Sequence, residues 1–366
     1  MNISLVMIVK NAERSLKRCL ESAAPLVDQM IVADTGSTDR TRKIAAEAGA
    51  RVLSFQWRDD FSAARNFALD HSDADWNLIL DSDEYLRSPS RKKLEQSVRR
   101  LSGLYGTRWM GAILRYDTFP GTDGNEVSIS PIPRFLPAGV RYSGIIHEQP
   151  HTDFPCYQIP LEADHDGYLF ENKGARNLAY LYKAVEQEPE DSYYRFQLAA
   201  TLRNLGKLPE ALEQFRAFYG SCPGASGYRT EGILLYLYTL MDIGSLTCLT
   251  EARGIIDKEQ ARLSGRADYW FVCGLFYMKL VLADTASYIG FLPEIEASYL
   301  TCLQIGEHPE QGGVIGTGSF KAAYNLACWY EVSGQTEKAA DYYRLAAKHG
   351  YQPALKRLAG MDRSQP

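Results

Sequence analysis

The first ninety residues alternate short, nearly continuous apolar runs with stretches whose apolar residues recur every three or four positions. Continuous runs of this length predict buried strands, and the other spacing predicts helices with one apolar face. The predicted strands are residues 3–9, 29–33, 51–55 and 76–80. We expect Asn11 to cap the first helix. Strands that alternate with helices predict an α/β layer around a mostly parallel sheet.

The pattern changes between residues 103 and 168, where glycine and proline are frequent and the apolar runs are short. Residues 111–116, 126–129 and 134–136 are predicted to form short antiparallel strands. Glycine and proline between such runs are typical of loops. We expect these strands and loops to complete the α/β domain and to contact substrate.

After residue 173 the chain becomes helical and repetitive. Counted from Ser192 and from Phe320, two segments carry leucine, alanine or aromatic residues at the same positions, 7, 8, 11, 20 and 24. This pattern, with a period of about 34 residues, is that of the tetratricopeptide repeat. Residues 230–257 and 268–307, which lie between the two copies, are predicted to be degenerate helix pairs with insertions.

These patterns predict two domains, an α/β domain over residues 1–170 and an all-α domain of tetratricopeptide-like repeats over residues 171–366. Residues 361–366 are expected to form a frayed tail. The longest apolar stretches start at Gly232 and Tyr269 and are shorter than the roughly 20 residues that a membrane span requires. We therefore expect buried helices there and no membrane span.

Charge and cysteine content exclude several classes of protein. The chain carries 40 Lys and Arg against 45 Asp and Glu and has no long basic run, so no nucleic-acid partner is indicated. Its seven cysteines include no C-x-x-C pair, which argues against a zinc knuckle or a redox motif. The N-terminus lacks a basic region and a cleavage site, so we interpret it as a strand rather than a signal peptide. We expect a cytoplasmic protein whose cysteines are small core residues.

Polar residues that could carry chemistry follow the predicted strands, where ligands bind in open parallel sheets. Asp81, Asp83 and Glu84 follow the fourth strand. Carboxylates at i and i+2 can hold a hard divalent cation, Mg²⁺ or Mn²⁺, together with substrate phosphates. The alternative is a solvated turn after a strand. The segment lacks the continuation that an EF-hand calcium loop requires.

The loop after the second strand carries a second candidate, Asp34, which is well placed to accept hydrogen bonds from a ribose or a base edge. Gly36 next to it is an ordinary turn residue. The loop after the first strand contains neither G-x-G-x-x-G nor G-x-x-x-x-G-K, so neither a Rossmann dinucleotide site nor a P-loop is indicated.

Four motifs, MIVKNAERSLKRCLES, VADTGSTDRT, WRDDFSAARNFAL and LILDSDEYL, stand in an order and spacing that resembles the nucleotide-sugar domain of family 2 glycosyltransferases. The resemblance covers residues 1 to about 170. It implies a GT-A fold, a UDP-sugar donor, and a divalent metal, Mn²⁺ or Mg²⁺, at the D-x-D of Asp81 and Asp83. Asp81 would meet the ribose or the edge of the metal, and Asp83 the metal itself.

The same resemblance implies which residues contact the nucleotide-sugar. They lie in the four motifs and, matched one by one, are Val9, Lys10, Asn11, Glu13, Asp34, Gly36, Arg65, Asn66, Asp81 and Ser82. Asp34 matches the carboxylate that meets the uridine. Arg65 and Asn66 match an R-N pair near the nucleotide.

Two further segments, YSGIIHEQ from Tyr142 and IPLEADHDGYLFENKGARN from Ile159, resemble a subgroup in which this domain precedes tetratricopeptide helices. This layout is similar to that of the sublancin-type peptide S-glycosyltransferases and of related uncharacterised bacterial enzymes. His147 and His165 are candidates to complete the metal shell, and His165 could instead bind the diphosphate. A structural role is the alternative for a lone histidine.

Glu148 is the candidate catalytic base. An inverting transfer needs a group that takes the acceptor's proton while the metal carries the charge that grows on the leaving diphosphate. The alternative is that Glu148 forms an ion pair with an arginine such as Arg134 or Arg141.

The leading hypothesis is therefore a metal-dependent, inverting glycosyltransferase that moves a sugar from a UDP-sugar to an acceptor. Tetratricopeptide arrays present concave surfaces to peptides, which favours a peptide or protein acceptor, with oxygen or sulfur as the accepting atom. The same helices could instead mediate a homodimer. The alternatives are a transferase for cell-envelope glycans and a non-catalytic scaffold that binds a nucleotide-sugar. A nucleotidyltransferase is disfavoured because MIVKNAER contains no glycine.

Overall fold

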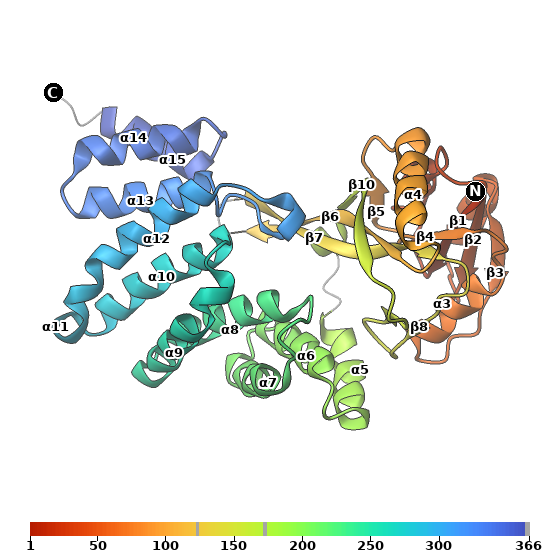
Figure 1. Ribbon diagram of the computed structural model, residues 1–366, viewed down its shortest axis with the longest axis horizontal. Coiled ribbons are helices and arrows are strands. Elements are labelled where there is room, and N and C mark those ends of the chain that lie inside the picture. The colour runs from red at the N-terminus through yellow and green to blue at the C-terminus, as the bar shows by residue number, and fades with distance from the viewer. Residues whose placement is uncertain (122–123, 171–173, 363–366) are drawn as a thin grey trace. The chain divides into compact units, whose positions relative to one another are not determined.

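A computed structural model describes residues 1–121, 124–170 and 174–362 (Figure 1). The chain divides into two compact units. The sheet unit consists of Met1–Pro120, Asn125–Ala184 and Glu310–Gly312, and the helical unit of Gly121–Gly124, Val185–Pro309 and Gly313–Pro366. The domain boundary expected between residues 170 and 171 falls beside residues 171–173, which lie outside the described residues, as do residues 363–366 of the expected tail. That boundary stays a prediction.

The sheet unit is built on strands in the order β3-β2-β1-β4-β7-β6-β10-β5. Their bounds are β1 Ile3–Val9, β2 Gln29–Asp34, β3 Arg51–Ser54, β4 Trp76–Ile79, β5 Glu84–Leu86, β6 Met110–Gly121, β7 Gly124–Pro137 and β10 Cys156–His165. The first four strands pair in parallel, as the alternation of strand and helix predicts. β7 joins β4 antiparallel, and β5 joins β10 antiparallel.

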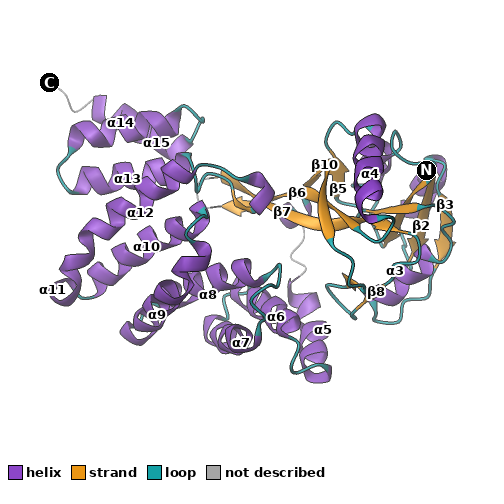
Figure 2. Ribbon diagram, viewed as in Figure 1, coloured by secondary structure: helices purple, strands orange, loops and turns teal. Residues whose placement is uncertain are grey.

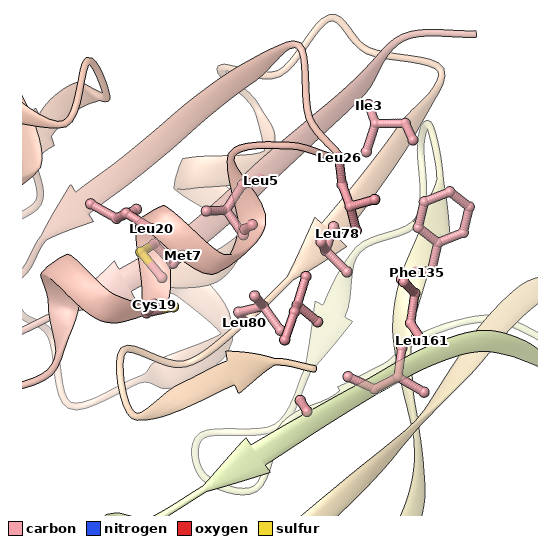
Figure 3. Close-up of a cluster of buried hydrophobic side chains, with 14 of the residues drawn as sticks. Ile3, Leu5, Met7, Cys19, Leu20, Leu26, Leu78, Leu80, Phe135 and Leu161 are labelled. Atoms are coloured by element: carbon pink, nitrogen blue, oxygen red, sulfur yellow. The ribbon is translucent and has the colours of Figure 1, made fainter. Parts of the chain in front are cut away.

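Helices cover both faces of this sheet, and the alternating side chains of β1 show how. Leu5 and Met7 belong to a core cluster with helices α1 (Leu16–Ala23), α2 (Thr41–Glu47) and α4 (Arg91–Tyr105) (Figure 3). Val6, between them, packs in a second cluster with α3 (Phe61–Leu69). A strand buried on both faces has no polar side to expose, which explains its nearly continuous apolar sequence.

The parallel register aligns the carboxyl ends of three strands at one edge of the sheet. Val9, the last residue of β1, pairs with Asp34, the last residue of β2, and Val6 pairs with Ile79 at the end of β4. The loops that follow these strands carry the candidate residues of the first, second and fourth motifs. The fold therefore gathers them at one place.

The expectation for residues 103–168 needs two corrections. The predicted strands 126–129 and 134–136 are parts of one longer strand, β7, and β6 is also longer than predicted. The pairing is mixed rather than antiparallel, because β10 runs parallel to β6. The length of an apolar run underestimates the length of a strand when the strand continues through proline and polar residues.

Asn11 does not cap the first helix, which begins at Leu16. Asn11 has a positive φ of 51°, and its side-chain oxygen accepts a hydrogen bond from the backbone N–H of Thr38 at 2.8 Å. It ties together the loops after β1 and β2. A helix cap joins residues that are close in the sequence, whereas this hydrogen bond joins residues 27 positions apart. A short stretch of sequence therefore does not reveal it.

The helical unit consists of successive helices (Figure 2). The bounds are α6 Ser192–Asn204, α7 Leu208–Ser221, α8 Arg229–Ile243, α9 Leu246–Leu263, α10 Ala267–Ala283, α11 Thr285–Tyr288, α12 Leu292–Ile305, α13 Phe320–Val332, α14 Thr336–Ala347 and α15 Gln352–Asp362. Helix α5 (Gly174–Gln187) precedes them. The pairs α6 with α7 and α13 with α14 coincide with the two repeats found in the sequence. Leu326, Ala327 and Tyr330 are buried at repeat positions in α13.

The apolar stretches from Gly232 and Tyr269 form α8 and α10, whose side chains are largely buried, so the prediction of buried helices is confirmed. No helix among the described residues has both the length and the apolarity to cross a membrane. All seven cysteines are free thiols. Five of them are buried as expected, but Cys156 is exposed, so the expectation that all cysteines are core residues is wrong at that position.

Candidate active site

The loops after β1 and β2 are fastened to each other. The Glu13 carboxylate accepts hydrogen bonds from the backbone N–H and from Nε of Arg40, at 3.2 and 3.3 Å. The backbone N–H of Asn11 donates to the hydroxyl of Ser37 at 2.9 Å. Lys10 and Asn11 are exposed beside these contacts, whereas Val9 is buried. The structure thus places the first two predicted nucleotide-binding segments side by side.

Asp34 is buried at the end of β2, with 2% of its surface exposed. Its carboxylate accepts hydrogen bonds from the backbone N–H groups of Gly36 and Ser37, at 3.3 and 3.2 Å. Gly36 has a φ of +108°, which is strained for any residue with a side chain. The carboxylate therefore helps to fix the conformation of the loop from within.

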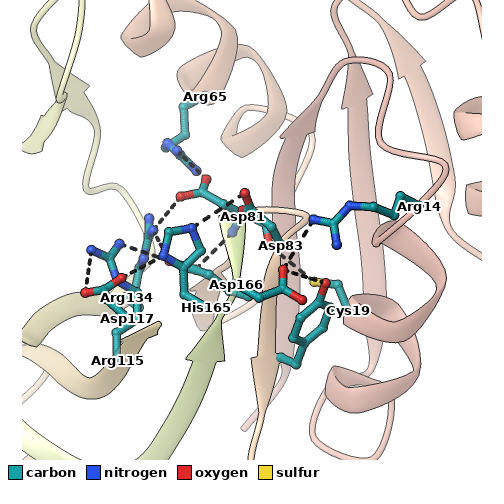
Figure 4. Close-up of polar contacts among 12 residues, drawn as sticks. Arg14, Cys19, Arg65, Asp81, Asp83, Arg115, Asp117, Arg134, His165 and Asp166 are labelled. Carbon is teal, nitrogen blue, oxygen red and sulfur yellow. Dashed lines mark hydrogen bonds and ion pairs between the residues drawn. The ribbon is translucent and has the colours of Figure 1, made fainter. Parts of the chain in front are cut away.

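Asp81, just beyond β4, lies between two arginines (Figure 4). Its Oδ1 accepts a hydrogen bond from Nη2 of Arg65 at 3.1 Å, and its Oδ2 from Nη2 of Arg134 at 2.6 Å. Burial on its own would raise the pKa of Asp81, but the charges of Arg134 and Arg65 hold that pKa well below the usual value. Asp81 is therefore ionised at neutral pH.

Glu84 extends this network into the interior, because its side chain is fully buried. Its Oε1 accepts from Arg134 at 2.6 Å and from Arg115 of β6 at 3.2 Å, while its Oε2 accepts from the backbone N–H of Asp81 at 3.0 Å. Buried carboxylates persist when several donors compensate the lost water. Glu84 thereby fixes the backbone of the D-x-D turn, which also contains the partly exposed Ser82.

Asp83, the second carboxylate of the D-x-D, meets His165 at the end of β10. Its Oδ2 lies 3.5 Å from Nε2 of the imidazole, and Nδ1 on the other side of the ring lies 2.6 Å from Oδ1 of Asp117. All three residues are less than 10% exposed. Burial would lower the pKa of His165, but the hydrogen bonds to Asp117 and Asp83 raise it to about 9. The sequence proposes His165 for the metal shell or the diphosphate. The structure places it beside Asp83, and its role stays a prediction.

Glu148 lies in a loop held between two short antiparallel strands, β8 (Tyr142–Ser143) and β9 (Gln149–Pro150). Its carboxylate accepts a hydrogen bond from Nε of Arg65 at 2.7 Å, so Arg65 joins Glu148 to Asp81. The ion pair considered for Glu148 from the sequence involved Arg134 or Arg141. The structure pairs it with Arg65 instead, and Arg141 contacts Asp70.

Asn66 positions this loop through the backbone of Tyr142. Its side-chain N–H donates to the Tyr142 carbonyl at 2.9 Å, and its side-chain oxygen accepts from the Tyr142 N–H at 2.8 Å. An amide that pairs with both backbone groups of one residue acts like a neighbouring strand. The R-N pair of α3 therefore anchors the loop that carries Glu148, with Arg65 bound to its carboxylate and Asn66 to its first strand.

Several buried polar atoms around this network have no hydrogen-bond partner. Among the described residues they belong to Arg65, Arg134, Tyr142 and His147, all in the sheet unit. Nε of Arg115 also makes no hydrogen bond, but it lies 2.9 Å from Oδ1 of Asp117 in an ion pair. Burial, and then the charge of Arg115, lower the pKa of His147 to about 4, so this imidazole is neutral at pH 7. Buried polar groups are almost always paired, and exceptions gather where a ligand or water binds.

The structure brings some of the proposed metal ligands together and not others. Asp83 and His165 are in contact, whereas Asp81 is engaged by two arginines. No group of three or more His, Cys, Asp or Glu side chains suited to a metal ion occurs in the parts of the chain that the structure describes. Any divalent cation here would complete its shell with ligands from outside the chain, as Mg²⁺ does with water and phosphate oxygens.

The sequence does not predict roles for Arg115 and Asp117, which lie two residues apart on the same face of β6. Arg115 binds Glu84, and Asp117 binds His165. The available signal was a pair of charged residues at i and i+2, because alternate residues of a strand share a face. Asp117 lies one residue beyond the predicted strand 111–116, and the observed β6 includes both residues. Their partners lie about 31 and 48 residues away along the chain, and local patterns carry no information about such pairs.

Comparison with known families identifies both parts of the chain. Residues 4–108 match the model of the family described as glycosyl transferase family 2, and residues 180–213 match a tetratricopeptide repeat model. The chain combines a family 2 glycosyltransferase domain with tetratricopeptide repeats. The α/β fold followed by helical repeats, expected from the sequence, is confirmed.

Curated relatives combine or share these parts. The glycosyltransferase SunS of the SPbeta prophage of Bacillus subtilis is 24% identical over 273 residues, which cover 71% of this chain and 64% of SunS. A TPR repeat-containing protein of Synechococcus elongatus is 33% identical over 228 residues, covering 57% of this chain and 54% of that protein. The chain thus spans less than two thirds of either relative.

Two solved structures align with parts of the chain. MamA from Desulfovibrio magneticus aligns with 54% of this chain and 90% of its own at 16% identity and a TM-score of 0.37. Glucosyl-3-phosphoglycerate synthase from Mycobacterium tuberculosis, in complex with Mn²⁺, UDP and glucosyl-3-phosphoglycerate, aligns with 33% of this chain and 44% of its own at 30% identity and a TM-score of 0.25. Scores this low do not establish a shared function.

Proposed function

We propose that the protein is a metal-dependent, inverting glycosyltransferase that moves a sugar from a UDP-sugar to an acceptor. The observation that carries this proposal is the position of Arg65, whose guanidinium binds both Asp81 of the D-x-D and Glu148, the candidate base, at 3.1 and 2.7 Å. One buried side chain thus joins the donor half of the site to the acceptor half. The family 2 domain over residues 4–108 supports the reaction class.

The residues at the D-x-D fit a hard divalent cation. A carboxylate oxygen of Asp83 and the ring Nε2 of His165 are 3.5 Å apart, which suits two ligands of one cation at bond lengths of about 2.0–2.2 Å. Gly167 has no side chain to fill the space beside them. Asp83, together with His165 once its Nε2 has lost its proton, would hold Mn²⁺ or Mg²⁺, and Asp81 would lie at the edge of the cation or meet the ribose. When bound, such a cation neutralises the charge that grows on the leaving diphosphate.

The donor would lie along the carboxyl ends of β1, β2 and β4. The joined loops of Val9 to Glu13 and Asp34 to Ser37 offer exposed backbone and side-chain polar groups for the nucleoside. Arg65 lies between the D-x-D and Glu148. Hydrogen bonds to two carboxylates hold the guanidinium of Arg65 in place.

Glu148 is the proposed base for the acceptor. Its side chain is 9% exposed and is oriented by Arg65, while Asn66 holds the strand at which its loop begins. A base within reach of the acceptor's proton contributes roughly 10²–10⁴ in rate. Glu148 would take that proton as the acceptor atom attacks the anomeric carbon.

The tetratricopeptide repeats favour a peptide or protein as acceptor, because such arrays bind extended polypeptide segments. The name of SunS says only that it is a glycosyltransferase, so the acceptor class rests on the repeats. Homodimerisation through the same helices is the competing use.

Calorimetric titration tests the proposal. UDP and a panel of UDP-sugars are titrated into the protein with and without Mn²⁺, and hydrolysis of each donor is followed in parallel. We expect metal-dependent binding of UDP and slow hydrolysis of one preferred donor. Absence of nucleotide binding in all conditions would contradict the proposal and favour a scaffold.

A further inference from the structure

Gly167 occupies a position where any side chain would collide with the candidate cation site. It begins the short 3₁₀ helix η1 (Gly167–Leu169), is buried, and stands two residues after His165. A Cβ at this position would lie 2.3 Å from Oδ2 of Asp83 and 2.7 Å from Nε2 of His165. A Cβ atom essentially never lies closer than 3.0 Å to another heavy atom that is not bonded to it.

The backbone does not explain the glycine. Gly167 is not among the glycines with positive φ, so a residue with a side chain could adopt its conformation. The constraint is therefore steric, and it comes from the two atoms proposed as metal ligands.

Neither atom can move aside freely. Asp83 and His165 are each 8% exposed. Oδ1 of Asp117 lies 2.6 Å from Nδ1 of His165, on the side of the ring opposite Nε2. Asp117 is in turn held by Arg115, whose Nε lies 2.9 Å from its Oδ1. A carboxylate on Nδ1 fixes the orientation of a histidine ring and leaves Nε2 to face a ligand. A side chain at residue 167 would therefore displace Asp83, His165 or both, unless the backbone of η1 itself moved.

We propose that Gly167 is a positioning residue of the cation site, whose missing side chain keeps open the space between Asp83 Oδ2 and His165 Nε2 in which a hard divalent cation binds. The proposal rests on the metal-dependent function proposed above. It adds that two segments, η1 and the D-x-D turn, determine the shape of the candidate cation site.

Gly167→Ala tests this directly, with Gly103→Ala as the matched control. Gly103 lies in α4 of the same unit, is exposed, and has nothing within 4 Å of the position of a Cβ. Mn²⁺ binding is measured by electron paramagnetic resonance of free Mn²⁺, with and without UDP, and folding by thermal melting. We expect Gly167→Ala to bind Mn²⁺ at least tenfold more weakly and to melt at a lower temperature than the unmodified protein, because the added Cβ overpacks a buried site. Gly103→Ala should bind Mn²⁺ as before and should not melt at a lower temperature.

The double variant His165→Ala/Gly167→Ala separates a local clash from a general defect. If the alanine at 167 acts by displacing His165 and Asp83, it should weaken Mn²⁺ binding less in the His165→Ala background than in the unmodified protein, because one of the two displaced ligands is already absent. The alanine at 167 should also lower the melting temperature less in that background, because only the clash with Asp83 remains. An equal loss of affinity and an equal loss of melting temperature in both backgrounds would overturn the proposal.

The outcomes also separate this proposal from the proposed function. Binding of Mn²⁺ by Gly167→Ala with unchanged affinity overturns the role of Gly167 and leaves metal dependence intact. No Mn²⁺ binding by the unmodified protein, with or without UDP, overturns metal dependence and the role of Gly167 together.

Discussion

The sheet unit and the helical unit each bury a cluster of charged side chains, but the two clusters are built differently. In the helical unit, Glu259 accepts hydrogen bonds from Arg229, Tyr219 and Arg262 at 2.9, 3.0 and 2.9 Å. The described residues of that unit have no buried side-chain nitrogen or oxygen without a partner. In the sheet unit, such orphaned atoms surround the network of Arg65, Asp81 and Glu148.

We interpret the cluster of the helical unit, whose described buried side-chain polar atoms are all paired, as one that stabilises the fold. We interpret the cluster of the sheet unit, which has unpaired atoms, as one that binds a ligand. A closed cluster has satisfied its polar groups within the chain, whereas orphaned buried groups cost free energy that a bound ligand can recover. The orphaned atoms and the D-x-D coincide in the sheet unit. This coincidence supports the placement of the active site there without reference to any relative.

The largest expected effect is on Asp83. We expect Asp83→Ala to abolish metal-dependent transfer, by about three orders of magnitude or more, because a ligand of the cation that stabilises the leaving group is lost. Circular dichroism should show unchanged helical content. Full donor hydrolysis in excess chelator by the unmodified protein would contradict the metal assignment.

The second expected effect concerns Glu148. Glu148→Gln keeps the shape of the side chain and a hydrogen-bond acceptor for Arg65 but removes the base, so turnover should fall by roughly 10²–10⁴. Affinity for UDP, measured by calorimetry, should change little. An equal loss of both would show that Glu148 only holds Arg65 in place.

The third prediction concerns the cluster around Glu259 in the helical unit. Glu259→Ala leaves Arg229, which is 9% exposed, without its carboxylate, and should reduce the free energy of unfolding by about 3–5 kcal/mol. Asp257→Ala, which removes an exposed ion pair with Arg253, should cost less than about 1 kcal/mol. Chemical denaturation measures both. Loss of UDP affinity in Glu259→Ala at unchanged stability would reverse the proposed division of roles.

A smaller effect is expected on the pH dependence of stability. Burial would raise the pKa of Glu259, but hydrogen bonds from Arg262, Arg229 and Tyr219 lower it below the usual value. A carboxyl whose pKa is lower in the folded state contributes stability that is fully present above its unfolded pKa, near 4.3, and is lost as pH falls through the folded pKa.

Glu259→Gln should therefore flatten the fall in unfolding free energy between about pH 5 and pH 3 relative to the unmodified protein. Denaturation series at several pH values measure the slope. An identical slope in both proteins would contradict the stabilising role of the Glu259 carboxylate.

The sequence predicted those parts of the fold that depend on local pattern. The strands β1 to β4 and the two complete repeats follow from apolar spacing, and the D-x-D follows from its place after a buried strand. The long β7 was divided in two because Pro131 and Pro133 interrupt its apolar run. The local sequence predicts a helix cap at Asn11 because it does not show the hydrogen bond with Thr38, which lies in another loop.

The site was predictable only where its residues stand in motifs. Arg65 and Glu148 are 83 residues apart, and Arg134 and Glu84 are 50 apart. Their contacts depend on β7 pairing with β4 and on the anchoring of β8 by Asn66. No single sequence displays such pairings, so Arg115 and Asp117 escaped notice although they complete the network.

The central claim is that the sheet unit binds a nucleotide-sugar with a divalent cation. Calorimetric titration of the purified protein with UDP, in the presence and absence of Mn²⁺, tests it most directly. The account predicts binding that requires Mn²⁺ and that is lost in Asp83→Ala and retained in Glu148→Gln. UDP binding that is independent of Mn²⁺ and unchanged in Asp83→Ala would contradict it.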